Sequence, residues 1–354
     1  MKNIKVGLIT FHDTNNFGSY LQTYGLSRAI EDLGYECEII DYQCESIVTR
    51  EIPKPFLFTL NPKQIIIELL FNIRKRTKYK KLKQFLQDNA SVKFRCDRSN
   101  IAEINAHYDK FVVGSDIVWG LDITKNDLTY FLDFVQNREK KIAFSSSIGN
   151  KWSESERIIL KPYLEDFSNI AVREDEAAEW ISEIIEKRPE VVCDPTMLID
   201  VATWKSFVSD KYSSHNYVLV YFTTRESIND ALRYAKHLSL PVYVINYSLP
   251  IRGVKNVRPD NMSDFLSLIN NASFIFTGSY HGFLFSIYFN KQFAYYNRAH
   301  KSRMNTLASR FGVEGHDGAL YDVLKMEPID YSLVNKELEI YRKKSIDVLE
   351  SFLK

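Results

Sequence analysis

The chain has 354 residues, of which 45% are hydrophobic and 26% charged, a composition typical of a globular protein long enough for two domains. Its 46 Lys and Arg residues against 45 Asp and Glu leave a net charge of +1, so no strong field predicts a nucleic-acid partner. The four cysteines lack CxxC or Cys/His ligand spacing, which argues against a zinc site or a disulfide framework and favours a reducing cytoplasm. Neither a leader peptide nor an apolar run of about 18 residues is visible, so we expect neither secretion nor a membrane span.

The first predicted elements form a βαβ unit. Asn3 to Thr10 is typical of a buried strand, Tyr20 to Leu33 of an amphipathic helix, and Glu38 to Asp41 of a second strand. Such a unit predicts a parallel, doubly wound sheet. The turn after the first strand lacks a GxGxxG pattern, which weakens a dinucleotide-binding interpretation. It carries His12 and Asn16 where such sheets bind ligands, although a turn that needs asparagine for its backbone angles explains these residues equally well.

A helical pattern runs from Asn61 to about Val92 and contains a basic stretch, Arg74 to Lys83. Most such runs are solvated helix faces. The functional alternative is electrostatic attraction to an anionic membrane or to a phosphorylated acceptor.

Three further strands of the first half end in polar turns. One leads into Ser115-Asp116, another into Ser145-Ser146-Ser147, and a third ends at Arg173. The structural interpretation of Arg173 is a salt bridge to a nearby acid such as Glu174, Asp175 or Glu176. Asp194-Pro195 then closes the first half, because proline ends a strand and the aspartate side chain can bond to the backbone.

The strand–helix pattern restarts after Val201, and βαβ units therefore occur on both sides of a boundary near residue 200. Apolar spacing from Tyr331 to Leu353 predicts a long amphipathic helix. We predict an α/β protein with two Rossmann-like, doubly wound domains facing a cleft, similar to GT-B glycosyltransferases, and a C-terminal helical tail. The predicted domains are residues 1–200, with a basic helical insertion at about 61–92, and residues 201–330, followed by the tail helix at 331–354.

The stretch from Asn271 to Asn290 contains the turn on which the functional interpretation depends. An apolar run from Ala272 to Phe276 predicts a buried strand, and helical spacing begins at Phe283. The small residues between them carry His281 at the start of a helix, where backbone N–H groups point at an anion. The structural alternative is that His281 caps the helix and Gly282 permits the turn.

Several of these turns, in this order, resemble motifs of the polysaccharide pyruvyltransferase family. The resemblance extends from about residue 3 to residue 313 and rests on Leu8-Ile-Thr-Phe-His12 with Asn16-Phe-Gly-Ser19, Val113-Gly-Ser-Asp116 with Trp119, Ala171-Val-Arg-Glu174, Asp194-Pro-Thr196, Thr277-Gly-Ser-Tyr-His-Gly282 and Arg303-Met304. Three residues depart from the family pattern: Ile117 replaces its usual Gln, Tyr280 its usual Phe, and Ser19 its common Ala. These three departures bear on which acceptor sugar is recognised more than on the reaction that is catalysed.

The resemblance implies transfer of the pyruvyl group of phosphoenolpyruvate onto two hydroxyls of one sugar, with formation of a cyclic ketal and release of phosphate. It implies that His281 is the general acid and then the base, and that Arg173 binds the anionic donor. The other donor-binding candidates lie on the same turn or downstream of it: Gly278, Ser279, Tyr280, Gly282 and Arg303. The acceptor-binding candidates are His12, Asn16 and Asp116. The scheme needs no metal and no cofactor other than phosphoenolpyruvate as co-substrate.

The expected partners are phosphoenolpyruvate and a glycan acceptor, a cell-surface polysaccharide or its lipid-linked precursor, at the cytoplasmic face of the membrane. Nucleic acid is not expected as a partner. Two alternatives remain open: a nucleotide-sugar glycosyltransferase of GT-B type, for which Asp260 or Asp264 would bind the ribose, and a non-catalytic carbohydrate-binding protein.

Overall fold

The computed structural model describes residues 4–53, 72–222, 224–297 and 301–354, which form two compact α/β units. Unit 1 comprises Met1–Ile52, Lys83–Ile199 and Glu339–Lys354, and unit 2 comprises Pro53–Leu82 and Asp200–Leu338. Two helices contribute residues to both units, α4 (Ile73–Asn89) and α13 (Tyr331–Leu353). Residues 54–71, which include the first part of the helical pattern predicted from Asn61, lie outside the described residues.

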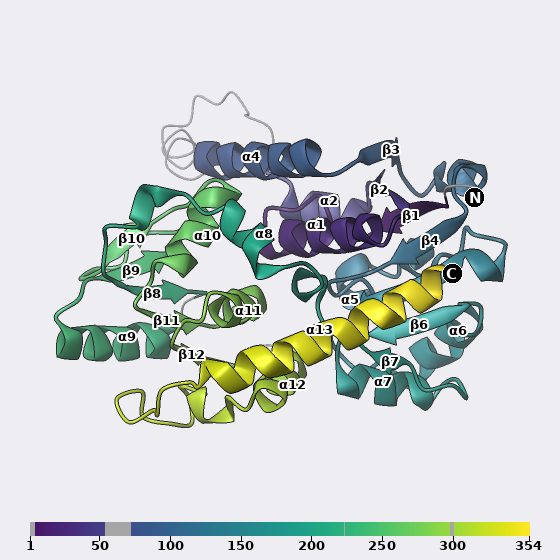
Figure 1. Ribbon diagram of the computed structural model, residues 1–354. Helices are drawn as coiled ribbons and strands as arrows, with labels where there is room; N and C mark the ends of the chain where they lie inside the picture. The colour runs from purple at the N-terminus through teal and green to yellow at the C-terminus, as the bar shows by residue number, and fades with distance from the viewer. Residues whose placement is uncertain (1–3, 54–71, 223, 298–300) are drawn as a thin grey trace. The chain divides into compact units, whose positions relative to one another are not determined.

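Unit 1 is built on a parallel sheet with the strand order β3-β2-β1-β4-β5-β6-β7 (Figure 1). The strands are β1 (Lys5–Ile9), β2 (Glu36–Tyr42), β3 (Val92–Cys96), β4 (Lys110–Val113), β5 (Lys141–Ser146), β6 (Asn169–Val172) and β7 (Glu190–Val191). The helices are α1 (Phe17–Asp32), α2 (Glu45–Glu51), α5 (Leu121–Thr124), α6 (Glu154–Glu165) and α7 (Asp175–Ser182), with short 3-10 helices η2 (Ile101–His107), η3 (Leu128–Phe131), η4 (Arg138–Lys140) and η5 (Pro195–Met197).

Apolar strand residues of unit 1 form a core in which both faces of the sheet are buried, as expected for a parallel sheet covered by helices. One hydrophobic cluster joins Ile9, Val113 and Val172 of the strands to Leu160 of α6 and Ala178 of α7. In Figure 1, α1 lies on the opposite face of this sheet from α6 and α7.

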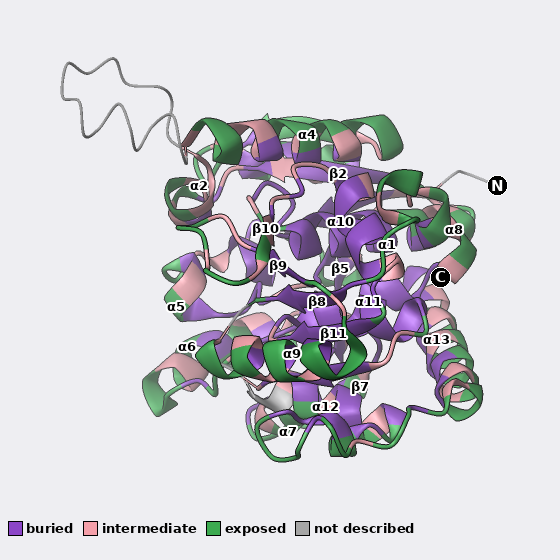
Figure 2. Cartoon of the chain, turned by 90° about the vertical axis from the view of Figure 1, so that its left-hand side faces the viewer, coloured by how far each residue is buried: buried purple, intermediate pink, exposed green. Residues whose placement is uncertain are grey.

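Unit 2 has a smaller parallel sheet with the order β10-β9-β8-β11-β12. Its strands are β8 (Val218–Tyr221), β9 (Val242–Ile245), β10 (Lys255–Val257), β11 (Phe274–Thr277) and β12 (Phe293–Tyr295). Its helices are α8 (Val201–Ser206), α9 (Arg225–Leu238), α10 (Met262–Asn270), α11 (Tyr280–Tyr288) and α12 (Lys301–Phe311), with η6 (Asp210–Tyr212) and η7 (Glu314–His316). Strands β8 and β11 are buried, whereas α9 carries exposed residues on its outer side (Figure 2).

The predicted α/β class with two doubly wound sheets is confirmed. The predicted helix that ended near Val92 is corrected, because α4 ends at Asn89 and Val92 begins β3. Val92 to Cys96 has β-branched and aromatic residues at alternate positions, which favours a strand.

The helix predicted from Tyr331 to Leu353 coincides with α13. The Ser345 hydroxyl of this helix accepts the N–H of Cys193 (2.9 Å), the residue before Asp194.

Several residues of the basic stretch on α4 contact other residues of the unit to which each belongs. Lys81 forms an ion pair with Asp260 in unit 2 (2.9 Å), and the Lys78 ammonium lies over the Tyr247 ring at 4.5 Å from its centroid. In unit 1, Lys83 pairs with Asp13 (3.1 Å). Part of this stretch is therefore a set of intramolecular contacts rather than a uniformly solvated face.

Candidate functional site

The turn between β11 and α11 places His281 in the first turn of a helix. Ser279 is the N-cap, and its hydroxyl accepts the N–H of Gly282 (3.2 Å). The Thr277 hydroxyl accepts the N–H of Ser279 (3.1 Å), and the Gly278 N–H donates to the Tyr221 carbonyl (3.1 Å). This combination of a capped helix start and a positive dipole end is a favourable environment for an anion.

Gly282 is required by the close approach of the helix to the strands. A Cβ atom at this position would lie 2.3 Å from Thr277 Oγ1 and 3.0 Å from the Tyr221 ring. Contacts that short force the neighbours to move. The glycine therefore allows α11 to begin directly above the ends of β8 and β11.

Three predicted donor-site side chains lie together in unit 2. The rings of Tyr280 and His281 meet edge to face with centroids 5.4 Å apart, and the Arg303 guanidinium lies 5.6 Å from the Tyr280 centroid. His281 is buried with 9% of its surface exposed, and Arg303 comes from α12. The structure thus brings an imidazole and a guanidinium to the same turn.

This turn lies where the strand order of the unit 2 sheet reverses, between β8 and β11. The chain runs outward from β8 to β9 on one side and from β11 to β12 on the other. Crevices at such switch points, at the carboxyl ends of the strands, are where open α/β sheets bind ligands. The corresponding point in unit 1 lies between β1 and β4, whose following turns contain Asn16 and Asp116.

The turn after β4 is held by buried polar side chains. Gln22 is fully buried, and its Oε1 accepts the N–H of Ser115 (3.2 Å). Its Nε2 donates to the hydroxyl of Thr10 (3.0 Å). The Thr10 hydroxyl itself donates to the carbonyl oxygen of Ser115 (3.1 Å). Asp116 accepts from the Ser19 hydroxyl (2.9 Å) and from the Ile117 N–H (2.8 Å). Ser19, which replaces the family's alanine, therefore bonds to a predicted acceptor-binding residue.

Asn16 has an identified structural role. It is the N-cap of α1, and its side-chain oxygen accepts the N–H of Gly18 (3.0 Å). The residue is exposed. Because the cap engages the side-chain oxygen, the amide N–H groups are the donors of this side chain that the cap does not use.

Arg173 is buried within a network of acids at the ends of β6 and β7. Its guanidinium contacts Asp194 (2.7 Å), Glu174 (3.2 Å) and the Ser115 hydroxyl (3.3 Å), and 2% of the side chain is exposed. Helix α1 lies so close to this region that a Cβ atom on Gly25 would be 2.6 Å from the Pro195 carbonyl oxygen. Sequence reasoning offered Glu174 as a partner and missed Asp194, although both follow adjacent strands of one sheet.

His12 is held by partners at the ends of β1 and β2. It is buried, with Nε2 3.0 Å from Asp41 and Nδ1 3.2 Å from the Thr10 carbonyl oxygen. Burial raises the pKa of Asp41, but the hydrogen bond and charge of His12 and the charges of Lys83 and Arg95 outweigh it, so the pKa lies below its ordinary value. His12 lines a cavity of about 280 Å³ that Lys83 and Arg95 also line.

Two polar residues at neighbouring strand ends adopt the left-handed backbone conformation that favours glycine. These are Asp116 (φ 67°) and Ser145 (φ 56°). Among the described residues, the hydroxyls of Ser145 and Ser147 are buried without a hydrogen-bond partner. Strained backbone and unsatisfied polar groups are common at functional sites, so the carboxyl ends of β4 and β5 are candidates for one.

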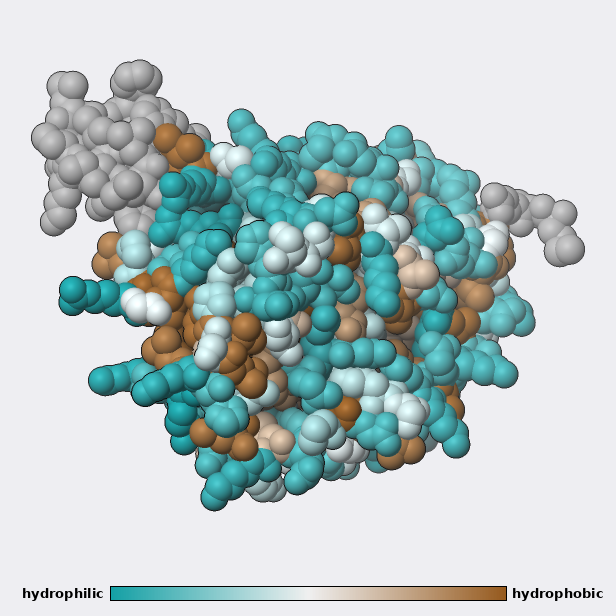
Figure 3. Space-filling model, turned by 60° about the vertical axis from the view of Figure 1, so that its left-hand side comes forward, coloured by the Kyte–Doolittle hydropathy of each residue, from teal (hydrophilic) through white to brown (hydrophobic). Residues whose placement is uncertain are grey.

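Within the described parts of the chain, no cluster of three or more His, Cys, Asp or Glu side chains has the arrangement of a metal site. The described helices also include none that is both long and apolar enough to cross a membrane. Most of the face drawn in Figure 3 carries hydrophilic side chains.

A family model described as polysaccharide pyruvyl transferase matches residues 16–300. Among solved structures, the S. aureus MnaA–UDP co-structure is 16% identical with a TM-score of 0.52 and covers 98% of this chain and 95% of that chain. A putative UDP-N-acetylglucosamine 2-epimerase from Listeria monocytogenes is 12% identical with a TM-score of 0.51 and covers 98% and 91%. These similarities concern the fold, which is of GT-B type. No curated protein sequence matches the chain significantly.

Proposed function

This chain belongs to the polysaccharide pyruvyl transferase family, and from that premise we propose that it transfers the pyruvyl group of phosphoenolpyruvate onto two hydroxyls of one sugar. The product is a cyclic pyruvate ketal on a cell-surface polysaccharide or its lipid-linked precursor, and the leaving group is inorganic phosphate. Phosphoenolpyruvate is the co-substrate, and the scheme includes no other cofactor.

The reaction balances in two additions. The first hydroxyl oxygen bonds to the enol carbon of phosphoenolpyruvate and loses its proton to the phosphate group, while a proton is delivered to the methylene carbon, which becomes a methyl group. The bond from the former enol carbon to the phosphate oxygen then breaks, and the phosphate leaves with the electron pair. The second hydroxyl adds to the same carbon and loses its proton to His281. His281 is the proposed donor of the first proton and acceptor of a hydroxyl proton, because an imidazole exchanges protons readily at neutral pH.

The observation that carries this proposal is the turn at the switch point of the unit 2 sheet. It combines the N-terminus of α11 with His281, and Arg303 lies over Tyr280 beside it. Phosphate and carboxylate groups bind at helix N-termini and to guanidinium groups. We therefore assign donor binding to Gly278, Ser279, Tyr280, Gly282 and Arg303 in unit 2.

Acceptor binding is assigned to unit 1, with Asp116, Asn16 and His12 as the proposed contacts. Asp116 and Ser145 have left-handed backbone angles at adjacent strand ends, and the Ser145 hydroxyl is buried and unsatisfied. Hydroxyl and carboxylate groups are suited to the hydroxyls of a sugar.

Arg173 has two competing roles within this proposal. As a catalytic group it would bind the donor anion, and as a positioning residue it would hold Ser115 next to Asp116. Its contacts with Asp194 and Glu174 support the second role, because Nη1 donates to one carboxylate and Nε to the other. The two roles differ in whether donor binding or folding is lost when Arg173 is replaced.

A lipid-linked acceptor would bring the protein to the cytoplasmic face of a membrane, and the exposed cations Arg74, Lys75 and Lys80 of α4 are the proposed contact. Co-sedimentation with vesicles that contain anionic lipid checks this. Binding that falls with added salt and is lost when the three residues are changed to Glu supports the contact. Equal sedimentation of both proteins removes it.

Phosphate release from phosphoenolpyruvate tests the reaction, with galactose, mannose and N-acetylmannosamine glycans as acceptors. We expect acceptor-dependent release that falls by about 100-fold to 10,000-fold in His281→Ala. Thermal stabilisation of the protein by phosphoenolpyruvate and by UDP-sugars is measured in parallel. Stabilisation by a UDP-sugar alone, with no phosphate release, would reject the pyruvyl donor in favour of a nucleotide-sugar glycosyltransferase. Glycan binding that is unaffected by His281→Ala, with no turnover of either donor, would indicate a non-catalytic binding protein.

A further inference from the structure

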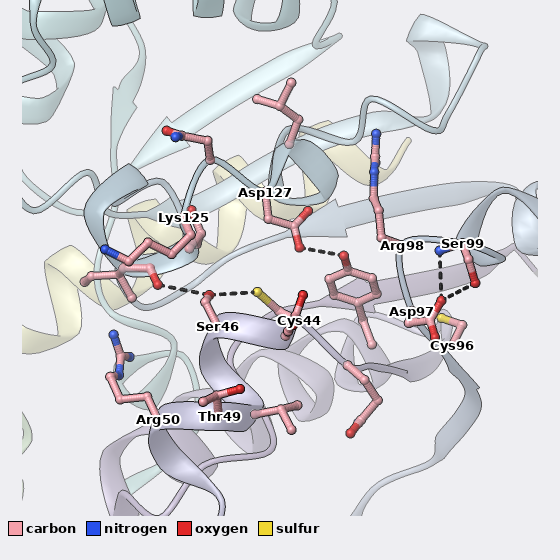
Figure 4. Close-up of a pocket in the computed structure, with 18 of the residues that line it drawn as sticks. Cys44, Ser46, Thr49, Arg50, Cys96, Asp97, Arg98, Ser99, Lys125 and Asp127 are labelled. Atoms are coloured by element: carbon pink, nitrogen blue, oxygen red, sulfur yellow. Dashed lines mark hydrogen bonds between the residues drawn. The ribbon is translucent and has the colours of Figure 1, made fainter.

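A second, larger cavity of about 1400 Å³ lies in unit 1 and contains none of the predicted site residues. It begins where the neighbouring strands β2 and β3 end, at Tyr42 and Cys96, and it is completed by α2 and by the segment from Asp122 to Leu128. Figure 4 shows Thr49 and Arg50 of α2 on one side, Arg98 and Ser99 on another, and Lys125 and Asp127 on a third. The carboxyl ends of parallel strands are the ligand-binding edge of such a sheet.

A chain of polar contacts connects this cavity to His12. One carboxylate oxygen of Asp41 accepts from His12 Nε2 (3.0 Å) and from Gln43 Nε2 (2.6 Å), and Gln43 lines the cavity. Arg95 approaches the side-chain oxygen of Gln43 (3.5 Å) and lines both this cavity and the smaller one beside His12. A ligand in the large cavity would therefore lie against Gln43, which bonds to Asp41, the carboxylate that holds the proposed acceptor-binding residue His12.

The charges around the cavity cancel. Four acids and four bases line it: Glu45, Asp97, Asp122, Asp127, Arg50, Arg95, Arg98 and Lys125. Several are already engaged, since Arg98 forms a two-pronged pair with Asp133 (2.5 and 2.6 Å) and Asp127 accepts from the Tyr42 hydroxyl (2.6 Å). A site for a diphosphate concentrates positive charge, so this balanced lining favours a neutral ligand with many hydrogen-bonding groups.

The two cysteines of the lining are not arranged for covalent chemistry. Burial raises the pKa of Cys96 to about 11 and also raises the pKa of Cys44. Both thiols are therefore protonated at neutral pH, and a thiol is a poor nucleophile. The volume exceeds the roughly 300–1,000 Å³ of ordinary small-molecule sites, which indicates a ligand larger than phosphoenolpyruvate or a single sugar.

We propose that this cavity binds the non-reacting sugars of a neutral acceptor glycan, and that Gln43 and Arg95 recognise the sugar adjacent to the one that receives pyruvate. This inference rests on the proposed function for the identity of the acceptor. It makes the preferred acceptor an oligosaccharide, because a monosaccharide would leave the cavity empty.

The first experiment measures binding without any donor. Isothermal titration calorimetry is run with tetrasaccharides and monosaccharides of galactose, mannose and N-acetylmannosamine, and with UDP. We expect a tetrasaccharide to bind at least about tenfold more tightly than its monosaccharide, and Arg95→Ala and Gln43→Ala to weaken tetrasaccharide binding by about tenfold. The control is Lys187→Ala, in which a cation is removed from a different cavity of the same unit and tetrasaccharide binding should not change.

A filling variant separates occupancy of the cavity from the loss of any one contact. Thr49 is exposed, lies on α2 and lines the cavity. Thr49→Trp should abolish tetrasaccharide binding, whereas Thr49→Ala, which leaves the space open, should alter it by less than about twofold. Thermal unfolding of each variant verifies that the protein is folded.

The outcomes distinguish the two proposals. Tetrasaccharide binding that Thr49→Trp abolishes, without phosphate release from phosphoenolpyruvate, supports the glycan site and rejects the pyruvyl reaction. Phosphate release with equal kcat/KM for monosaccharide and tetrasaccharide, unaffected by Thr49→Trp, supports the reaction and rejects the site. Binding of UDP that Thr49→Trp abolishes, or failure of every tetrasaccharide to bind, also rejects the glycan site.

Discussion

The two candidate sites occupy equivalent positions in their sheets but are built differently. In unit 1, the turn after β4 is held by side chains that bond to one another, with Arg173 and Gln22 buried at its base. In unit 2, the turn after β11 is held by the backbone, a cap and a glycine, and its larger side chains contact one another through their rings. A polar network makes folding depend on the candidate site residues, whereas a turn held by its backbone makes folding depend less on His281 and Arg303.

The largest contrast is expected between the two arginines. Arg173→Ala should lower the free energy of unfolding by about 3–5 kcal/mol, because it leaves buried carboxylates without their counter-charge. Arg303→Ala should lower it by less than about 1 kcal/mol, the usual contribution of a cation–π contact that is partly exposed. Chemical denaturation measures both.

Two further measurements sharpen this contrast. Asp194→Ala should destabilise the protein as Arg173→Ala does. The double variant should be less destabilised than the sum of the two single variants, since both remove the same ion pair.

Thermal stabilisation of the protein by phosphoenolpyruvate should be lost in Arg303→Ala. If Arg173→Ala folds with wild-type stability yet loses that stabilisation, Arg173 contacts the donor and the assigned positioning role is wrong.

The next effect concerns the glycine on which the unit 2 turn depends. Gly282→Ala should destabilise the protein by about 1–3 kcal/mol, because the new methyl group overlaps Thr277. Gly315→Ala is the matched control: a Cβ atom added there would meet no atom within 4 Å, and its effect should stay within about 0.5 kcal/mol. Equal stabilities of the two variants would show that the turn tolerates displacement and is not held by this close approach.

A pH-dependent effect on stability is expected from Asp41 in unit 1. The folded-state pKa of Asp41 lies below its ordinary value, so the ionised carboxylate stabilises the fold at pH values above that ordinary pKa. This contribution to stability is lost as the pH falls through the folded-state pKa. Asp41→Asn should therefore be less stable than wild type by about 1.5 kcal/mol at neutral pH. The gap should close as the pH falls below about 4. A gap that does not change with pH would mean that Asp41 contributes through packing and not through its charge.

The smallest effect separates the two uses of Asn16. Asn16→Ala removes the cap of α1 and should cost about 1 kcal/mol of stability. Asn16→Asp keeps a capping oxygen and removes the amide N–H donors, so it should preserve stability while raising KM for the acceptor. Unchanged KM in a stable Asn16→Asp variant would leave Asn16 with a structural role alone.

Local sequence patterns predicted the individual strands and helices around both turns. Alternation of apolar runs with helical spacing identified β1, α1, β11 and α11, because each depends on residues close in the chain. Sequence patterns failed at β3, where a helical pattern was extended into the strand that begins at Val92. They also missed β10, a strand of three residues that is too short to show a period.

Contacts between distant residues were beyond those patterns. Arg173 was paired with acids that follow it directly, whereas its shortest contact is with Asp194, 21 residues later. The signal was present in principle, because Asp194 follows the strand adjacent to β6 and carboxyl ends of neighbouring strands meet at one edge. Gln43 and Arg95 gave no local signal, because their significance depends on the cavity that they line.

The sequence by itself determined the family, the α/β class and the turns that carry His12, Asp116, Arg173 and His281. These follow from local periodicity, glycine and proline positions, and the order of short motifs. Only the tertiary structure decided that Arg173 is enclosed by Asp194 and Glu174, that Arg303 lies beside Tyr280, and that a large cavity with balanced charges adjoins Gln43. The reason is physical: the sheet order brings separate strand ends together, and no local pattern specifies which side chains then meet.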